Sequence, residues 1–275
     1  MDGRVVSREP TTHGAPMYEA ELAFANELAN QAGAIAMSFF RGSFDVRTKV
    51  DKTPVTEADL AIEAMVRSAV RERYPGDGVL GEEGGAEGET SRRWIVDPID
   101  GTKNFADGIQ VWATLIALEV DGRVVLGVIN AAALGERYEA VRGLGARMNG
   151  EPIVVSRADR IARASVSHAG VADWVDGEFG SPLLDLLRSA RRTRAFGDFW
   201  GHALVARGSV DVCFERELAT WDWAAVQVVV EEAGGRMTQF DGSPLAHGGS
   251  VLTTNGALHD EILARLEAGR RELPA

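Results

Sequence analysis

Two aspartates stand three residues apart directly after a short apolar run, and this pattern restricts the fold more than any other feature of the chain. Residues 93–96 predict a buried strand, and Pro98 and Gly101 then make the chain turn. Asp97 and Asp100 should therefore face one small volume. Two carboxylates in a partly dry pocket raise each other's pKa unless a cation neutralises them, and Mg²⁺ is the usual solution. The alternative is a solvated turn, because DxxDG strings also occur without a metal.

Three further acidic groups are candidates for the same site. Glu82 and Glu83 lie between glycines shortly before the aspartate pair, so a short loop can bring a carboxylate back to it. Asp222 lies between two tryptophans at the start of an apolar helix, where burial would demand a partner. Asp59 follows Thr56 by three residues. Each has a structural alternative: a solvated acidic turn, an N-terminal helix acid and a capping box, respectively.

The distribution of helix and strand signals divides the chain. Helical spacing is predicted over residues 22–39 and again after Thr56. The pairs Asp121-Gly122 and Asn149-Gly150 predict hairpins and an antiparallel sheet, the second between residues 140–141 and 153–155. After Ser156, helices alternate with short strands. We therefore expect three parts: a flexible tail over residues 1–17, an N-terminal α+β lobe over 18–155 and a C-terminal α/β lobe over 156–275.

Charge and composition bear on the partners of the protein. The formal net charge is −12 and no basic stripe offsets it, which argues against nucleic acid. No apolar run is long enough for a membrane span, and the N-terminus does not resemble a secretory signal. The single cysteine, Cys213, fits a reducing compartment and is expected to be a small buried residue. We therefore expect a cytoplasmic protein.

Several motifs between Asp51 and Gly235 together resemble one known family. They are PVTEAD, GEEGG, WIVDPIDGTKNF, GARMNG and WDWAAVQVVVEEAGG. In this order they resemble the inositol-monophosphatase-like family of Mg²⁺-dependent, lithium-sensitive phosphomonoesterases. The resemblance implies an α/β fold, a layered α/β/α/β/α sandwich with the site between two lobes. It also implies a homodimer and a small phosphate monoester as the substrate.

The resemblance also implies roles for particular residues. The implied ligands of two or three Mg²⁺ ions are Glu82, Asp97, the carbonyl of Ile99, Asp100 and Asp222. Asp59 and Thr102 would orient and deprotonate the attacking water, and the amides of Gly101 and Thr102 would hold the phosphate. Glu83 would support the ligands from outside, and Lys49 or Lys52 would lie near the metal loop.

Within the family the chain most resembles the histidinol-phosphate phosphatases. The segments responsible are GTKNFADGIQVWATLIAL, RAFGDFWGHALVARGSVDV and GGSVLTTNGALHDE. Glu215 and Asp198 would pair with the cationic groups of histidinol phosphate. Arg194 and Trp112 are further pocket candidates, with a surface cation and a core aromatic as the alternatives.

Two other functions remain open from the sequence. An inositol-1-phosphate phosphatase would share every metal ligand. A catalytically silent, metal-holding scaffold would share the fold, but it would be expected to have lost at least one member of the acidic set.

Overall fold

The computed structural model describes residues 18–40, 46–48, 54–89 and 91–270. The expected tail, residues 1–17, lies outside these ranges, and so do Lys49 and Lys52. Within the described residues, no helix is both long and apolar enough to cross a membrane.

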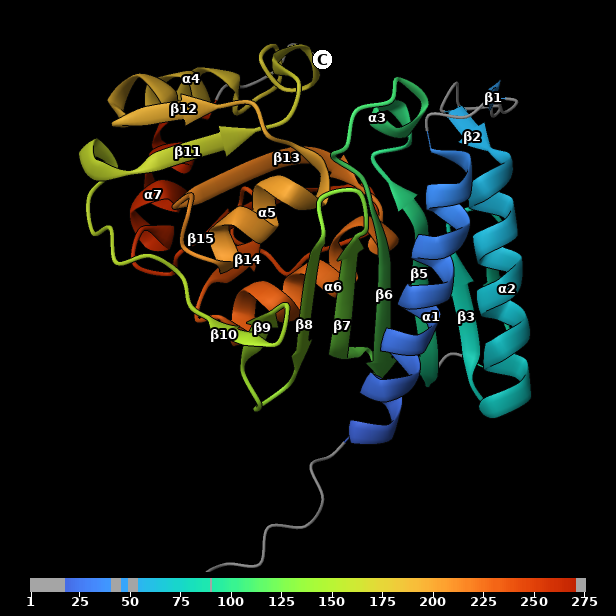
Figure 1. Ribbon diagram of the computed structural model, residues 1–275. Helices are drawn as coiled ribbons and strands as arrows, with labels where there is room; N and C mark the ends of the chain where they lie inside the picture. Colours follow the sequence, from blue (N-terminus) through green and yellow to red (C-terminus); the bar gives the residue numbers. More distant parts are fainter. Residues whose placement is uncertain (1–17, 41–45, 49–53, 90, 271–275) are drawn as a thin grey trace, which may run out of the picture.

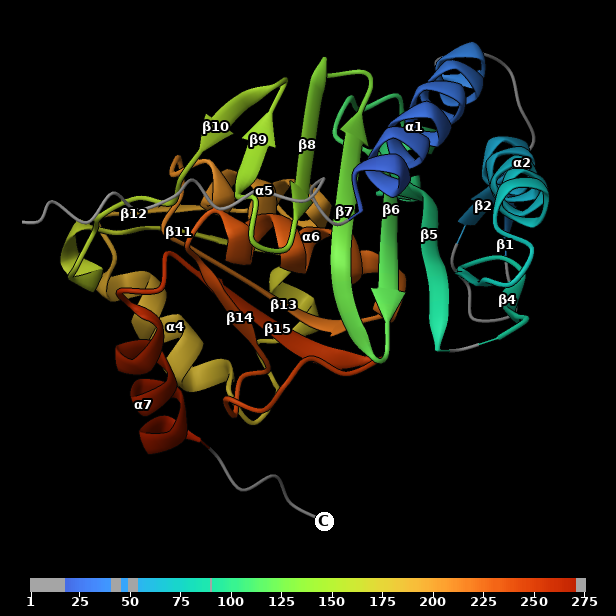
Figure 2. The ribbon, with the colours of Figure 1, turned by 90° about the horizontal axis from the view of Figure 1, so that it is seen from below.

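Helices and sheets alternate in five layers, as the resemblance implied (Figures 1 and 2). Helices α1 and α2 cover the outer face of a large sheet, α5 and α6 lie between this sheet and a smaller one, and α4 and α7 cover the other face of the smaller sheet. The α-helices are α1 (Glu19–Phe39), α2 (Glu57–Arg73), α3 (Thr102–Ala106), α4 (Gly180–Ser189), α5 (Asp198–Ala206), α6 (Thr220–Glu232) and α7 (His259–Gly269). Two 3₁₀ turns span Ile161–Arg163 and Val171–Asp173.

The large sheet has the strand order β10-β9-β8-β7-β6-β5-β3-β4 and is antiparallel except where β3 pairs with β5. Its strands are β3 (Gly78–Gly81), β4 (Gly85–Glu87), β5 (Arg92–Asp100), β6 (Ala113–Val120), β7 (Arg123–Ala131), β8 (Glu136–Val141), β9 (Ala146–Met148) and β10 (Glu151–Ile153). A separate two-stranded ribbon pairs β1 (Val46–Thr48) with β2 (Pro54–Thr56).

The smaller sheet has the order β12-β11-β13-β15-β14 and mixes parallel and antiparallel pairs. Its strands are β11 (Ser165–His168), β12 (Arg192–Arg194), β13 (Val212–Leu218), β14 (Arg236–Thr238) and β15 (Gly249–Thr254). The sequence did not predict β11 or β12, because each is short and β12 consists of exposed polar residues. The two sheets draw on residues 78–153 and 165–254, but the division into two lobes at residue 155 stays a prediction.

Helix α6 lies at the centre of the molecule, and its sequence reflects this. It carries a nearly continuous apolar run, because it packs against the large sheet on one side and the smaller sheet on the other. It ends in a Schellman motif: Gly234 has φ 92°, its amide bonds to Glu231 and the amide of Gly235 bonds to Val230. The glycine pair Gly234-Gly235 thus ends the helix that begins just before Asp222.

Both predicted hairpin turns are present. Asp121 and Gly122 have φ 50° and 75°, and Asn149 and Gly150 have φ 50° and 84°, as a type I′ turn requires. The first joins β6 to β7 and confirms the prediction. The second joins β9 to β10, so the strand expected at 140–141 was the wrong partner for this turn. That strand, β8, ends one turn earlier and pairs with β7 and β9.

Glu82 and Glu83, which were expected in a short loop, lie in the turn of a hairpin formed by β3 and β4. Its turn rests on the buried carboxylate of Glu63 in α2, which accepts hydrogen bonds from the amides of Glu83 and Gly84, each at 2.7 Å. Arg67 donates to the Gly85 carbonyl at 2.6 Å. These contacts place Glu82 next to the end of β5.

A glycine in β7 permits the close contact between the large sheet and α6. A Cβ added at Gly127 would lie 2.5 Å from the Ala225 carbonyl oxygen and 2.6 Å from a methyl group of Val228. We expect Gly127→Ala to lower the free energy of unfolding by about 1–3 kcal/mol, because the packed helix has to shift. Gly76→Ala is the matched control, since nothing lies within 4 Å of a Cβ there. Equal urea midpoints for both variants would contradict this prediction.

Candidate active site

Asp97 and Asp100 lie at the end of β5, but the strand does not stop at Asp97 as predicted. It continues to Asp100 through an irregularity, in which Asp97 pairs with Leu115 and Asp100 with Ala113 of β6. The three residue steps from Asp97 to Asp100 on β5 thus lie opposite only two residue steps, from Leu115 to Ala113, on β6. In a regular strand, residues three apart point to opposite faces. The extra residue lets both aspartates reach the same side.

Asp222 approaches this pair from α6. It is the third residue of the helix, and its Oδ2 accepts a hydrogen bond from the Ala219 amide at 2.7 Å, so the helix-capping alternative is also realised. Asp97, Asp100 and Asp222 each offer a carboxylate oxygen, and these oxygens lie within 4.8 Å of one another. A strand end and a helix start that are far apart in sequence therefore form one acidic cluster.

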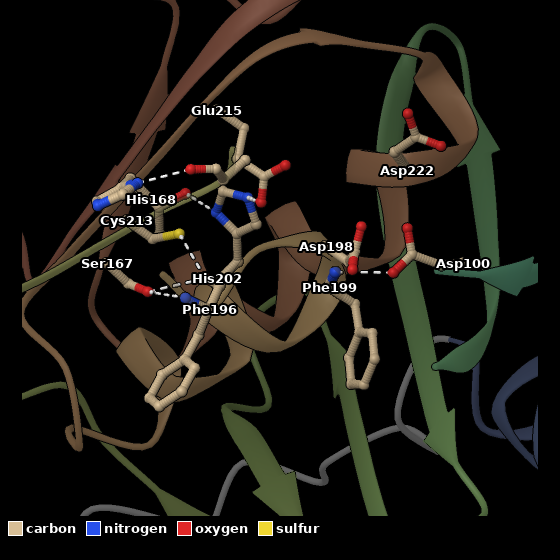
Figure 3. Close-up of polar contacts among 12 residues, drawn as sticks. Asp100, Ser167, His168, Phe196, Asp198, Phe199, His202, Cys213, Glu215 and Asp222 are labelled. Atoms are coloured by element: carbon tan, nitrogen blue, oxygen red, sulfur yellow. Dashed lines mark hydrogen bonds and ion pairs between the residues drawn. The ribbon is translucent and has the colours of Figure 1, made fainter. Parts of the chain in front are cut away.

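The acidic cluster forms the wall of a cavity of about 340 Å³. Figure 3 shows Asp100, Asp198 and Asp222 around part of it. The lining residues are Glu82, Asp97, Ile99, Asp100, Gly101, Thr102, Lys103, Asn104, Asp198, Phe199, His202, Leu218 and Asp222. All five residues predicted as metal ligands, and both predicted phosphate-binding residues, thus line the same cavity.

Burial and mutual repulsion strongly perturb the acids of this cavity. Desolvation, followed by the charge of Glu82 and then of Asp100, raises the pKa of Asp97 well above its usual value. Desolvation also raises the pKa of Asp100, and the charges of Asp198 and Asp222 add to the effect. The pKa of Asp222 is raised to about 7, with desolvation as the largest cause. These carboxyls can all be ionised together only if a cation offsets their charge, and without one they would keep protons.

The donor set fits a hard divalent cation. It consists of carboxylate oxygens and the Ile99 carbonyl, the ligand type that Mg²⁺ prefers. Oδ1 of Asp97 is buried and has no hydrogen-bond partner among the described residues. A bound cation would satisfy this atom and remove the repulsion, so the residues fit a metal centre.

Thr102 lines the cavity, and Asp59 lies close enough for its charge to act on Asp97. Asp59 is fully buried in the first turn of α2, and its Oδ2 accepts hydrogen bonds from the amide and hydroxyl of Thr56 at 2.7 and 2.5 Å. The predicted capping box is therefore present, and the charge of Asp59 still contributes to the raised pKa of Asp97. The Thr102 hydroxyl donates to the Ile99 carbonyl at 3.0 Å.

Gly101 shapes the turn between the aspartates and α3. Its φ of 82° lies in the left-handed region, and a Cβ there would come within 3.0 Å of the Val111 carbonyl oxygen. The turn brings Thr102 and Lys103 to the cavity wall.

Another part of the cavity wall comes from the start of α5, next to Asp100. Asp198 has φ 55°, and its carboxylate accepts a hydrogen bond from Asn104 at 2.9 Å. The next amide, of Phe199, donates to Oδ2 of Asp100 at 2.7 Å (Figure 3). The pKa of Asp198 is raised to about 6, first by desolvation and then by the charge of Glu215, while Lys103 opposes the shift.

The other predicted pocket residues are placed differently. Glu215 is buried behind His202 and is not among the residues lining the cavity. Arg194 is exposed on β12 and donates to the Thr193 carbonyl, so the surface alternative describes it in this structure. Trp112 is fully buried against Phe40 and Phe105, which makes it a core aromatic.

The sequence interpretation missed His202 as part of this site. His202 was not among the candidate residues, yet it lines the cavity. The residue lies one helical turn after Asp198 on α5, and this i, i+4 spacing was the signal that could have indicated it.

The chain thus combines a layered α/β sandwich with buried carboxylates around one cavity. The chain belongs to the inositol monophosphatase family, whose model matches residues 17–271. The family's phosphatases are metal-dependent and hydrolyse phosphoric monoesters.

Individual relatives cover nearly the whole chain. A histidinol-phosphatase from Mycobacterium tuberculosis is 46% identical, over 92% of this chain and 100% of its own length. A histidinol-phosphatase from Streptomyces coelicolor is 43% identical, over 91% of this chain and 98% of its own. Among solved structures, an inositol monophosphatase from Zymomonas mobilis has a TM-score of 0.83 at 32% identity and covers 92% of this chain and 100% of its own.

Proposed function

We propose that this protein is a Mg²⁺-dependent phosphomonoesterase that hydrolyses L-histidinol phosphate to L-histidinol and phosphate in histidine biosynthesis. The observation that supports the chemistry most is the cavity in which Glu82, Asp97, Asp100 and Asp222 meet. The choice of substrate rests on the relatives named histidinol-phosphatase, at 39–46% identity over most of the chain.

The acids would hold two or three Mg²⁺ ions together with the Ile99 carbonyl. When bound, such ions lower the pKa of a water and neutralise charge on the phosphate ester. Asp59 and Thr102 would orient this water and take its proton. The amides of Gly101 and Thr102 would hold the phosphate oxygens in the turn before α3.

The alcohol part of the substrate would extend toward α5. Histidinol phosphate carries an ammonium group, and Asp198 offers a carboxylate at the cavity wall. Glu215, directly behind His202, would add negative potential there. The acid pair at this end suits a cationic alcohol better than an uncharged polyol.

The inositol-1-phosphate reading has its own support, since several solved neighbours are named inositol monophosphatases. We keep it as the second candidate, with the acids Asp198 and Glu215 as the feature against it. A catalytically silent scaffold would be expected to have lost at least one acidic residue of the site. The acidic set is complete in this chain, which speaks against that alternative.

From the family resemblance we also expect a homodimer, and a measurement of the molar mass in solution tests this.

A growth experiment tests the proposed function in a cell. The chain is expected to restore growth without histidine to a bacterial auxotroph that lacks histidinol-phosphatase. The Asp97→Asn variant is the control and should not restore growth. Failure of the expressed, folded wild-type protein to support growth would contradict the proposal.

The role of Thr102 gives a second test. Thr102→Ala should lower kcat about 10²-fold or more, because the water loses a group that orients it for proton transfer. Metal binding should change little, since the hydroxyl is not one of the proposed ligands. The Mg²⁺ concentration for half-maximal activity separates the two effects. An unchanged kcat would remove Thr102 from this role.

A third test concerns the proposed contact between Asp198 and the ammonium group of the substrate. Asp198→Asn should raise KM for L-histidinol phosphate about 10- to 100-fold, because a charge-assisted contact contributes about 1.5–3 kcal/mol. A phosphate ester without an ammonium group, such as glycerol 2-phosphate, serves as the control substrate and should show a much smaller change. Equal effects on both substrates would mean that Asp198 supports the site generally and does not select the alcohol.

A further inference from the structure

A second cluster of possible ligands lies beneath the cavity, where α5 crosses β13. His202 comes from α5, and Cys213 and Glu215 lie two residues apart on β13, so both side chains leave the strand on one face. One ligand atom from each lies within 4.8 Å of the others, and Nε2 of His202 is 3.4 Å from Oε1 of Glu215. Figure 3 shows the imidazole beside the carboxylate and the thiol.

These groups are almost completely withdrawn from solvent. His202 is 1% exposed, Cys213 0% and Glu215 5%. Nδ1 of His202 pairs with the Thr253 hydroxyl at 2.7 Å, which turns Nε2 toward the cluster. Neither Nε2 nor Oε1 of Glu215 has a hydrogen-bond partner among the described residues. The two atoms face each other at 3.4 Å, which makes an ion pair when the imidazole is protonated, and a bound cation would complete both when it is neutral.

Two glycines make the close approach possible. A Cβ at Gly201 would lie 2.6 Å from the sulfur of Cys213, and one at Gly197 would lie 3.3 Å from Oε1 of Glu215. Both residues lie at or near the start of α5. Side chains at these positions would crowd the sulfur of Cys213 and the carboxylate of Glu215.

We propose that His202, Cys213 and Glu215 bind one transition-metal cation of the Zn²⁺ class, at a site separate from the acidic cluster. Imidazole nitrogen, thiolate sulfur and carboxylate oxygen are the ligands that Zn²⁺ takes, whereas Mg²⁺ takes oxygen. Three protein ligands leave a fourth position for water. The Thr253 contact matches the hydrogen bond that the second nitrogen of a metal-bound histidine ordinarily makes.

For the cation to bind, the Cys213 thiol must lose its proton and the cation must reach the buried ligands. Burial and the charges of Glu215 and Asp198 raise the pKa of the Cys213 thiol, so it is protonated in the free protein and donates weakly to the Phe196 carbonyl. On binding, the thiol proton leaves to solvent and the sulfur bonds to the cation. His202 also lines the cavity, which gives the cation a path to the cluster.

A cation bound by His202, Cys213 and Glu215 is not part of the proposed function, but it would affect the binding of the proposed substrate. A cation held by Glu215 and His202 would take away negative charge near Asp198. Zn²⁺ at saturating Mg²⁺ should therefore raise KM for L-histidinol phosphate. This effect on KM rests on the proposed function, whereas metal binding at the cluster can be measured independently of it.

Cobalt titration of the purified protein tests the site directly. Co²⁺ replaces Zn²⁺ in such sites, and a cobalt–thiolate bond gives a charge-transfer absorption in the near ultraviolet. Cys213 is the sole cysteine and the acidic cluster contains no sulfur, so this absorption reports the proposed site alone. With Mg²⁺ saturating, we expect the band to grow to a plateau at one Co²⁺ per chain and Zn²⁺ to remove it.

Variants supply the controls. Cys213→Ser should abolish the band, and His202→Gln should weaken Co²⁺ binding at least about tenfold. Circular dichroism checks that each variant is folded. No band in the wild-type protein would overturn the proposal whatever the variants do. A band of undiminished affinity in folded His202→Gln would overturn it as well, because the thiol would then bind cobalt by itself.

Discussion

Asp222→Asn is expected to reduce turnover about 10³-fold or more while the protein stays folded. The carboxylate lies within 4.8 Å of ligand atoms of Asp97 and Asp100, so its loss removes one wall of the proposed metal centre. Metal ions supply several kcal/mol of charge stabilisation in such reactions, and each 1.36 kcal/mol is tenfold in rate. Asparagine keeps the side-chain oxygen that accepts the Ala219 amide, so the start of α6 is preserved.

The measurement is the rate of phosphate release as a function of Mg²⁺ concentration. The loss should be partly recovered at high Mg²⁺, because the defect is one of metal affinity. Asp185→Asn, at an exposed position on α4, is the matched control and should behave as wild type. Normal activity of Asp222→Asn at low Mg²⁺ would remove Asp222 from the ligand set.

Mg²⁺ is expected to raise the melting temperature, and to raise it more at pH 8 than at pH 5.5. The pKa of Asp198 is raised to about 6 and that of Asp222 to about 7 by burial and neighbouring acids. A carboxyl with a raised native pKa stabilises the fold below its unfolded pKa, and this contribution is lost as the pH rises through 6 and 7. The metal-free protein should therefore lose stability over this range.

Mg²⁺ at about 100 times its Kd adds about 2.7 kcal/mol, or roughly 5–10 °C for a chain of this size. The Asp97→Asn variant removes a carboxylate that four neighbouring acids repel, so its metal-free form should melt above the wild type at pH 8. Its response to Mg²⁺ should be smaller. Differential scanning calorimetry with and without EDTA measures both. An equal Mg²⁺ shift in the wild type and Asp97→Asn would contradict the electrostatic account.

Most of the candidate acidic site could be predicted from the sequence, because its residues belong to short motifs whose members are neighbours in the chain. Asp97 and Asp100 share one turn with Gly101, and Asp222 opens a helix with a clear end. Each of these residues lines the cavity in the structure. The order of the motifs then indicated a family, and with it a layered fold that the structure confirms.

Features that depend on packing between distant segments were not predictable. The turn that places Glu82 rests on Glu63, a helix residue whose role appears only once α2 lies beside β3. His202 reaches the cavity because Gly201 lets α5 approach β13. Arg194 was a pocket candidate, but it lies on an exposed edge strand that its polar sequence did not predict.

The relative turnover of two esters tests the central claim most directly. Purified protein with equal, saturating Mg²⁺ is given L-histidinol phosphate and inositol 1-phosphate side by side, and kcat/KM is measured for each. We predict a preference for L-histidinol phosphate of about 10²-fold or more, on the order expected when a site built around charged contacts meets an ester without them. Faster hydrolysis of inositol 1-phosphate would contradict the assignment of the substrate, and no phosphate release from either ester would contradict the enzyme itself.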